Sequence, residues 1–203
     1  MKLVYGITVS TEEKEVLRLI KYLKDNTKND IVVQYDESKD NSDLIDKIKK
    51  FDVTLTSYVF DGDFSNFKNN LNLTCEEKCK ADYIFQLDAD EMISDYLVNN
   101  IDSIIEENPQ VELFYLPRIN TVEGITMEHI NKWKWNLDKQ GRINFPDYQG
   151  RIYKSNLQWS GNVHERIVGV KNYSLFPLEE EFCIIHNKTI KKQEEQNELY
   201  SSL

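Results

Sequence analysis

The feature that most constrains the fold is the regular alternation of extended and helical segments in the first 90 residues. Short β-branched apolar runs indicate strands, and apolar positions three and four residues apart indicate helices. The extended segments are residues 2–10, 30–36, 52–60 and 83–90, and the helical ones are residues 12–26, 41–51 and 63–82. This order predicts consecutive βα units, and therefore a mostly parallel sheet flanked by helices in an α/β fold.

The second half of the chain departs from this pattern. A helical segment at 94–108 is followed by strand-like segments at 111–119, 150–159 and 181–187, and by a charged helix at 190–203. A long connection between residues 119 and 150 contains three glycines and a proline. No repeat or linker separates the halves, so the 203 residues are expected to form a single domain.

Composition excludes some classes of function. Acidic side chains outnumber basic ones 35 to 25, and a net charge of −10 argues against nonspecific nucleic-acid binding. No apolar run approaches the roughly 20 residues of a membrane helix, and the N-terminal stretch is too short for a signal peptide. We therefore expect a cytoplasmic protein with no transmembrane segment. Cys75, Cys79 and Cys183 lack the second ligand pair of a zinc site, which favours buried thiols.

Carboxylates follow the most apolar predicted strand, in the segment YIFQLDADEM. That strand is apolar on both faces, as a central strand covered by helices should be. Asp88 and Asp90 are two residues apart at its carboxyl end, where α/β sheets bind ligands, and in an extended segment they would point the same way. Their repulsion would be relieved by Mg²⁺ or Mn²⁺, which would also let an acidic protein hold a diphosphate. The alternative is that Asp88, Asp90 and Glu91 only begin the next helix.

Two blocks in the first half carry a resemblance to a known family. IVVQYDESKDNS resembles a strand followed by V-D-x-S-x-D-x-S/T, and DFSNFKNNLNLTCEEKCKADYIFQLDADE resembles F-x-x-x-R-N followed by A-x-x-x-W-I-L-x-L-D-A-D-E. Both are typical of metal-dependent family-two glycosyltransferases of the GT-A fold, especially short bacterial lipopolysaccharide-core and cell-surface glucosyltransferases. The resemblance implies that Asp36 and Asp40 lie near the uracil of a UDP-sugar. It places Asp88 near the ribose and on the metal with Asp90. Lys68 replaces the usual arginine as a diphosphate or base contact.

Two blocks in the second half continue the resemblance. FPDYQGRIYKSNLQWSGNVHERI is similar to Q-x-R-L-F followed by W-x-G-x-V-H-E, which implies that Gln149 and Arg151 contact donor or acceptor and that Glu165 is the catalytic base. FCIIHNKTIKKQEEQNELYSS is similar to H-x-x followed by K-x-N-R-Y-S, which makes His186 a metal or diphosphate ligand. Two alternatives remain open, an exposed Glu165 paired with Arg166 or Lys171, and a core His186.

The resemblance implies a metal-dependent inverting glycosyltransferase that uses Mn²⁺ or Mg²⁺ and a nucleotide-sugar donor, with a glycan, lipid-linked or protein acceptor. Residues 1–92 would bind the donor and residues 93–203 the acceptor, with residues 119–150 as a closing lid. A nucleotidyltransferase is an alternative, but its glycine-rich basic turn is missing from VYGITVSTEEKE. A noncatalytic binding module of the same fold is the other alternative.

Overall fold

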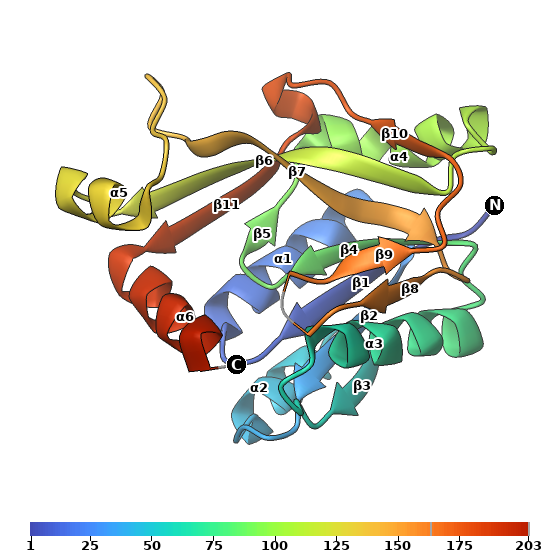
Figure 1. The fold of residues 1–203 in the computed structure, drawn as a ribbon. Coiled ribbons are helices and arrows are strands. Elements are labelled where there is room, and N and C mark those ends of the chain that lie inside the picture. Colours follow the sequence, from blue (N-terminus) through green and yellow to red (C-terminus); the bar gives the residue numbers. More distant parts are fainter. Residues whose placement is uncertain (163, 203) are drawn as a thin grey trace.

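The computed structural model describes residues 1–162 and 164–202, with side chains described up to residue 198. Its first half follows the predicted alternation of strands and helices (Figure 1). The elements are β1 (Leu3–Val9), α1 (Glu13–Asn26), β2 (Asp30–Asp36), α2 (Ser42–Ile48), β3 (Thr54–Tyr58), α3 (Phe64–Cys79) and β4 (Tyr83–Asp88). Strands β1 to β4 pair in parallel, which confirms the predicted βα units.

The second half extends the same sheet with strands of both directions. Its first elements are β5 (Glu91–Met92), α4 (Asp95–Glu107), β6 (Leu113–Glu123), α5 (Met127–Trp133) and β7 (Ile143–Lys154). They are followed by β8 (Gln158–Ser160), β9 (Arg166–Val168), β10 (Tyr173–Leu175), the 3₁₀ helix η1 (Glu180–Phe182), β11 (Ile184–Thr189) and α6 (Ile190–Ser202). Within the described residues, nine strands form one sheet in the order β3-β2-β1-β4-β7-β6-β11-β5, with β10 beside β6.

Strand β7 joins the two halves. It is antiparallel to both β4 and β6, so the parallel strands of the first half continue directly into the mixed sheet of the second. The short strands β8 and β9 form a separate antiparallel ribbon, which we call the β8–β9 ribbon (residues 158–168). The structure is thus a single α/β domain with a mostly parallel mixed sheet flanked by helices, as predicted.

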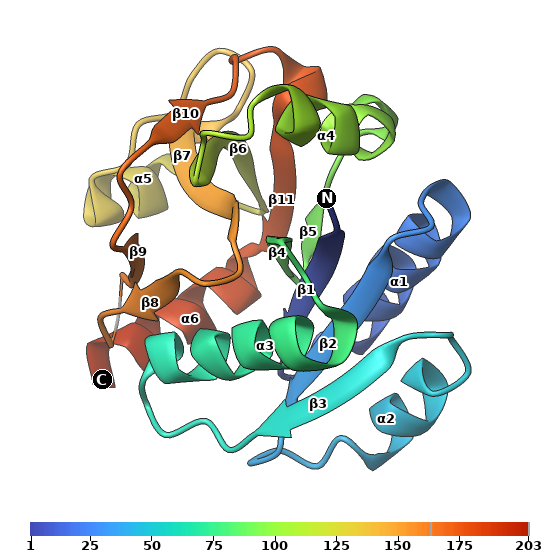
Figure 2. The same cartoon turned by 90° about the vertical axis from the view of Figure 1, so that its right-hand side faces the viewer.

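Helices cover both faces of the sheet, as Figure 2 shows for α1 and α2 on one side and α3 on the other. Helix α1 buries a stripe of apolar side chains at helical spacing, formed by Val16, Leu19, Ile20 and Leu23. On the other face, α3 packs through Leu71 and Cys75 against Val4, Ile84 and the β8–β9 ribbon. Two hydrophobic clusters, one on each face, hold the strands between them. The carboxyl ends of the strands are thereby held rigidly at one edge of the sheet.

The structure corrects two expectations about local conformation. Asp90 lies in a turn between β4 and β5, so an extended backbone does not align it with Asp88. The connection from residue 119 to 150 is largely regular, because β6 runs on to Glu123, α5 follows, and β7 begins at Ile143. Glycines and polar side chains concealed how far the two strands extend, whereas α5 coincides with a segment that is helix-like in sequence, residues 126–133. The role of this segment as a lid stays a prediction.

Candidate active site

The carboxylates of the DADE segment lie where β4 ends at the edge of the sheet. After Asp88 the chain turns through residues 89 and 90, and β5 then pairs antiparallel with β11 at the far side of the sheet. This pairing sets Glu91 opposite His186 and brings Nε2 of His186 to 3.4 Å from Oδ1 of Asp90. Two residues 96 positions apart in the sequence therefore meet because of how the sheet is ordered, and not through any local pattern.

Asp88 is held in place by two side chains beneath it. Its Oδ2 accepts a hydrogen bond of 2.6 Å from Nη2 of Arg151, and its Oδ1 accepts one of 3.1 Å from the Thr8 hydroxyl. Burial alone would raise the pKa of this carboxyl, but the charges of Arg151 and then Lys68 outweigh burial and hold the pKa well below its usual range. Asp88 is thus ionised and rigidly oriented.

A buried ion network lies under this carboxylate. Glu91 is fully buried and accepts hydrogen bonds from Arg151 at 2.6 Å, from Arg118 at 3.1 Å and from the Asp88 backbone amide at 2.9 Å. Arg118 also binds Oδ2 of Asp147 at 2.8 Å. Within the described residues, Nε and Nη1 of Arg151 are buried without a hydrogen-bond partner. The Arg151 guanidinium therefore acts mainly as a buried positive charge that offsets Asp88 and Glu91. The network holds in place the carboxyl edge of the sheet where Asp88 and Asp90 lie, which we call the carboxylate edge.

Hydrogen bonds determine which nitrogen of His186 carries a proton. Nδ2 of Asn120 donates to Asp147 at 2.8 Å, which turns Oδ1 of Asn120 toward Nδ1 of His186, also at 2.8 Å. Because that oxygen can only accept, Nδ1 must donate, and in a neutral imidazole the lone pair of Nε2 then faces Asp90. Two acceptors that face each other at 3.4 Å require a cation between them, which is either a proton or a metal ion.

Two lysines face the same edge from the C-terminal part of the chain. Lys188 on β11 donates a hydrogen bond of 2.6 Å to Gln196 of α6, and Lys192 of α6 forms an ion pair of 2.6 Å with Glu15 of α1. Both lysines line a cavity of about 340 Å³. Burial lowers the pKa of Lys188, and the negative charges of Asp90 and Asp88 only partly oppose this effect. Together, Lys188 and Lys192 place positive charge near Asp88 and Asp90 in an otherwise acidic protein.

Glu165 lies on the β8–β9 ribbon, next to α3. Its Oε1 accepts a hydrogen bond from Nζ of Lys68, which also lies 4.2 Å from the centre of the Trp159 ring. The glutamate side chain is 15% exposed, and it pairs with Lys68 and not with Arg166 or Lys171. The alternative of an exposed Glu165 paired with Arg166 or Lys171 is therefore wrong. The Glu165 side chain is half-buried near the edge of the sheet.

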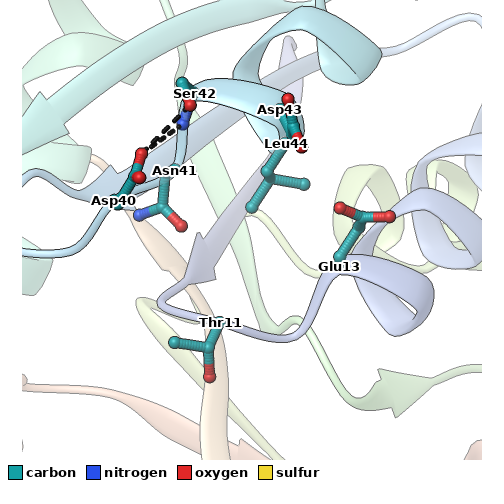
Figure 3. Close-up of a pocket in the computed structure, with 7 residues that line it drawn as sticks. All are labelled: Thr11, Glu13, Asp40, Asn41, Ser42, Asp43 and Leu44. Carbon is teal, nitrogen blue, oxygen red and sulfur yellow. Dashed lines mark hydrogen bonds between the residues drawn. The ribbon is translucent and has the colours of Figure 1, made fainter.

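The residues expected near the nucleotide base lie at the ends of β2 and α2. Oδ1 of Asp36 accepts hydrogen bonds from the backbone amides of Ser38 and Phe60, so this carboxylate joins the loops that follow β2 and β3. Asp40 is exposed and binds the hydroxyl and amide of Ser42. Figure 3 shows Asp40 at a polar pocket of about 260 Å³, which is lined by Thr11, Glu13, Asp40, Asn41, Ser42, Asp43 and Leu44.

Gln149 has a protein partner in this structure. Nε2 of Gln149 donates to Asp147 at 2.7 Å, so Gln149 supports the ion network in this structure.

The alternative that Asp88 and Asp90 only begin the next helix is wrong, because Ser94 is the N-cap of α4 and accepts from the amide of Leu97. Cys75, Cys79 and Cys183 are buried thiols, as expected.

Several site residues were missed by reading the sequence. They are Thr8, Arg118, Asn120, Asp147, Lys188 and Lys192. One signal was available for Arg118, since a charged residue inside the apolar strand VELFYLPRI must find a buried partner. The others gave no local signal, because most of their partners lie far away in the chain, up to 177 residues for Lys192 and Glu15.

Asp147 provides a test of the ion network through pH. Burial raises the pKa of this carboxyl, but the charge of Arg118 and hydrogen bonds from Asn120, Arg118 and Gln149 lower it below its ordinary value. The stabilisation is therefore complete above the unfolded Asp pKa of about 4, and it is lost as pH falls through the lower folded value. We expect Asp147→Asn to lose about 1–2 kcal/mol of unfolding free energy at pH 7.

The measurement is urea unfolding of both proteins at pH 7, 5 and 3. The difference between wild type and Asp147→Asn should stay constant from pH 7 to 5 and shrink at pH 3. A difference that is independent of pH would mean that the Asp147 charge does not contribute.

Comparisons with known proteins support the fold. No protein-family model and no curated protein sequence matches the chain. Among solved structures, the chain is similar to a 4-diphosphocytidyl-2C-methyl-D-erythritol synthase, with 10% identity, a TM-score of 0.55 and coverage of 98% of this chain and 100% of that one. Since the identity is so low, this likeness shows the fold alone.

Two further similar structures are enzymes of two kinds. One is a cytidylyltransferase from Leptospira borgpetersenii serovar Hardjo-bovis, with 14% identity, a TM-score of 0.43 and coverage of 66% of this chain and 64% of that one. The other is glucosyl-3-phosphoglycerate synthase from Mycobacterium tuberculosis with Mn²⁺, UDP and glucosyl-3-phosphoglycerate, with 9% identity, a TM-score of 0.47 and coverage of 76% and 57%. The chain thus spans less than two thirds of the length of both proteins.

No helix in the described part of the chain is long and apolar enough to cross a membrane. The structure is a single α/β domain whose fold is similar to that of the 4-diphosphocytidyl-2C-methyl-D-erythritol synthase.

Proposed function

We propose that this protein is a metal-dependent inverting glycosyltransferase that moves a sugar from a nucleotide-sugar, a UDP-sugar in the simplest case, to an acceptor hydroxyl. The observation that carries the proposal is that Oδ1 of Asp90 and Nε2 of His186 lie 3.4 Å apart at the carboxyl edge of the sheet. Such a pair is poised for a divalent cation, and α/β sheets bind nucleotides at this edge.

The residues present fit Mn²⁺ or Mg²⁺. Carboxylate oxygen suits both ions, and an imidazole nitrogen favours Mn²⁺ of the two. No group of three or more His, Cys, Asp or Glu side chains in the described residues forms a metal cluster. Two protein ligands nevertheless suffice where diphosphate oxygens and water complete the shell, and Asp88 lies next to them. When bound, the ion would neutralise the charge that develops on the departing diphosphate.

The remaining residues divide the other tasks of the reaction. Glu165 would take the proton from the acceptor hydroxyl while that oxygen attacks the anomeric carbon and the bond to the diphosphate breaks. Lys188 and Lys192 would bind the diphosphate, since they line one cavity and both lie within electrostatic reach of Asp90. Asp36 and Asp40 would lie near the base, at the ends of β2 and α2. The acceptor, a glycan, lipid-linked or protein hydroxyl, would approach from the side of residues 93–203.

A nucleotidyltransferase is the second candidate, because the structure with the 0.55 TM-score belongs to that class of enzyme. Such an enzyme needs free backbone amides after β1 to hold a triphosphate. In this protein, the Glu12 carboxylate accepts hydrogen bonds from the amides of Ser10 and Thr11, at 3.0 and 2.9 Å. Negative charge therefore occupies the place where the triphosphate would bind, which favours glycosyl transfer.

Calorimetric titration tests the proposal. We expect UDP to bind with Mn²⁺ and at least tenfold more weakly without it, because Asp90 and His186 hold the ion that the diphosphate needs. Asp90→Asn should remove this metal dependence, whereas Asp46→Asn, a change at an exposed residue of α2, should preserve it. UDP-sugars would then be screened for transfer and slow hydrolysis.

Two outcomes would contradict the proposal. Binding of CTP or UTP in preference to UDP, with pyrophosphate released in the presence of a sugar phosphate, would show a nucleotidyltransferase. An absence of binding by UDP, GDP, ADP, CTP and UTP, with and without Mn²⁺, would favour the noncatalytic module.

A further inference from the structure

We propose that Lys68 is the positioning residue for Glu165, and that it orients this carboxylate for proton transfer without contacting the donor. The inference rests on the proposed function, in which Glu165 is the base. It differs from the contact with the diphosphate or the nucleotide base that the family resemblance implies for Lys68. Three observations support it: the enclosed position of Lys68, the way α3 holds the β8–β9 ribbon, and the location and backbone conformation of the segment that carries Glu165.

The first observation is that Lys68 is enclosed. It lies on α3 with only 8% of its surface exposed, although lysine is almost never buried without a partner. Its partner is Oε1 of Glu165, and its ammonium lies 4.2 Å from the centre of the Trp159 ring. A cation held over an aromatic face and against a carboxylate has little freedom to turn toward a diphosphate.

The second observation is that the ribbon carrying Glu165 is fastened to α3 on the N-terminal side of the glutamate. Asn69, next to Lys68, donates to the Trp159 carbonyl at 3.0 Å and accepts from the Trp159 amide at 2.8 Å. The Phe64 amide at the start of α3 donates to the carbonyl of Asn162 at 3.1 Å. These contacts place the backbone of the ribbon, and Lys68 then determines where the carboxylate of Glu165 points.

The third observation concerns location and strain. Lys68 lies within electrostatic reach of Asp88, so the ion pair is beside the carboxylate edge. His164, directly before Glu165, has a φ of +58°, in the left-handed region that non-glycine residues seldom adopt. Strain of this kind is concentrated at functional sites, where the surrounding structure maintains it. Because Lys68 engages Oε1, the acceptor proton would go to Oε2.

The test compares Lys68→Met and Lys68→Arg with a control on the same helix, Lys78→Met, which changes an exposed lysine of α3. For each variant we would measure kcat, the donor and acceptor KM, and the Kd of UDP with Mn²⁺. We expect Lys68→Met to lower kcat about 10- to 100-fold with the UDP Kd changed less than about twofold, since only base placement is lost. Lys68→Arg should recover part of the rate because it keeps the charge. Thermal melts identify any variant that does not fold.

A double variant separates positioning from general structural damage. If Lys68 acts only through Glu165, Lys68→Met should cause no further loss of kcat in the Glu165→Gln background. The proposal is overturned if the losses multiply, or if Lys68→Met weakens UDP binding tenfold at unchanged kcat. Wild-type protein that binds no UDP and transfers no sugar would overturn the proposed function itself, and this outcome is distinct from both of those.

Discussion

Replacing Arg151 with methionine is expected to lower the free energy of unfolding by about 3–5 kcal/mol, a large fraction of the stability of a domain of this size. The side chain is 3% exposed and binds Asp88 and Glu91 through one nitrogen, Nη2. Methionine fills most of the volume but leaves the fully buried Glu91 with Arg118 as its nearest compensating charge. Removing one member of a buried ion pair costs more than removing both.

Urea unfolding at pH 7 measures this effect. The control is Arg18→Met, which changes an exposed arginine of α1 and should alter stability by less than about 0.5 kcal/mol. The double variant Arg151→Met with Glu91→Gln should regain part of the lost unfolding free energy, because the buried charge of Glu91 is removed as well. A loss below about 1 kcal/mol for Arg151→Met would show that the network does not hold up the carboxylate edge.

Replacing Glu165 with glutamine is expected to lower kcat for sugar transfer by about 10²- to 10⁴-fold. Glutamine keeps the size of the side chain and can still accept a hydrogen bond from Lys68 through Oε1, but it cannot take a proton from the acceptor hydroxyl. The Kd of UDP with Mn²⁺ should stay within about twofold of wild type, because Asp90 and His186 are unchanged.

Initial rates with a UDP-sugar and its acceptor, measured beside a UDP titration, check this expectation. Glu165→Asp should retain the charge but withdraw the carboxylate by one methylene, so it should also lose rate. Glu106→Gln on the exposed face of α4 serves as the control and should keep full activity. A Glu165→Gln variant with normal kcat would remove Glu165 from the reaction and point to another base.

Much of the fold could be predicted from local sequence. Alternation of apolar residues with period two or 3.6 is a property of each segment by itself, and it located β1 to β4 and α1 to α3. The doubly apolar strand at residues 83–88 had to be central, and β4 does lie between β1 and β7. Less could be predicted for residues 119–150, where polar composition concealed the end of β6 and the first part of β7.

The candidate site could also be predicted from the sequence only in part. Asp88, Asp90, His186 and Glu165 were selected from short motifs, because a motif preserves residue types at fixed spacing. Their partners Arg118 and Asn120 were not, and Arg151 was selected only as a donor or acceptor contact, because all three act through contacts across the sheet. The expectation that Asp88 and Asp90 share a face because the strand continues was wrong in its reasoning, since the chain turns after Asp88. Asp90 instead meets His186 because β5 pairs with β11.

The sequence by itself determined the class of fold, the order of its parallel strands and helices in the first half, and which acidic side chains follow β4. These depend on local propensity and on the periodic burial of apolar residues. The tertiary structure decided which charges meet, namely Lys68 with Glu165, Arg151 with Asp88 and Glu91, and His186 with Asp90. The physical reason is that ion pairs and hydrogen bonds depend on distances of a few ångströms between residues far apart in the chain, and only the packed sheet and helices set those distances.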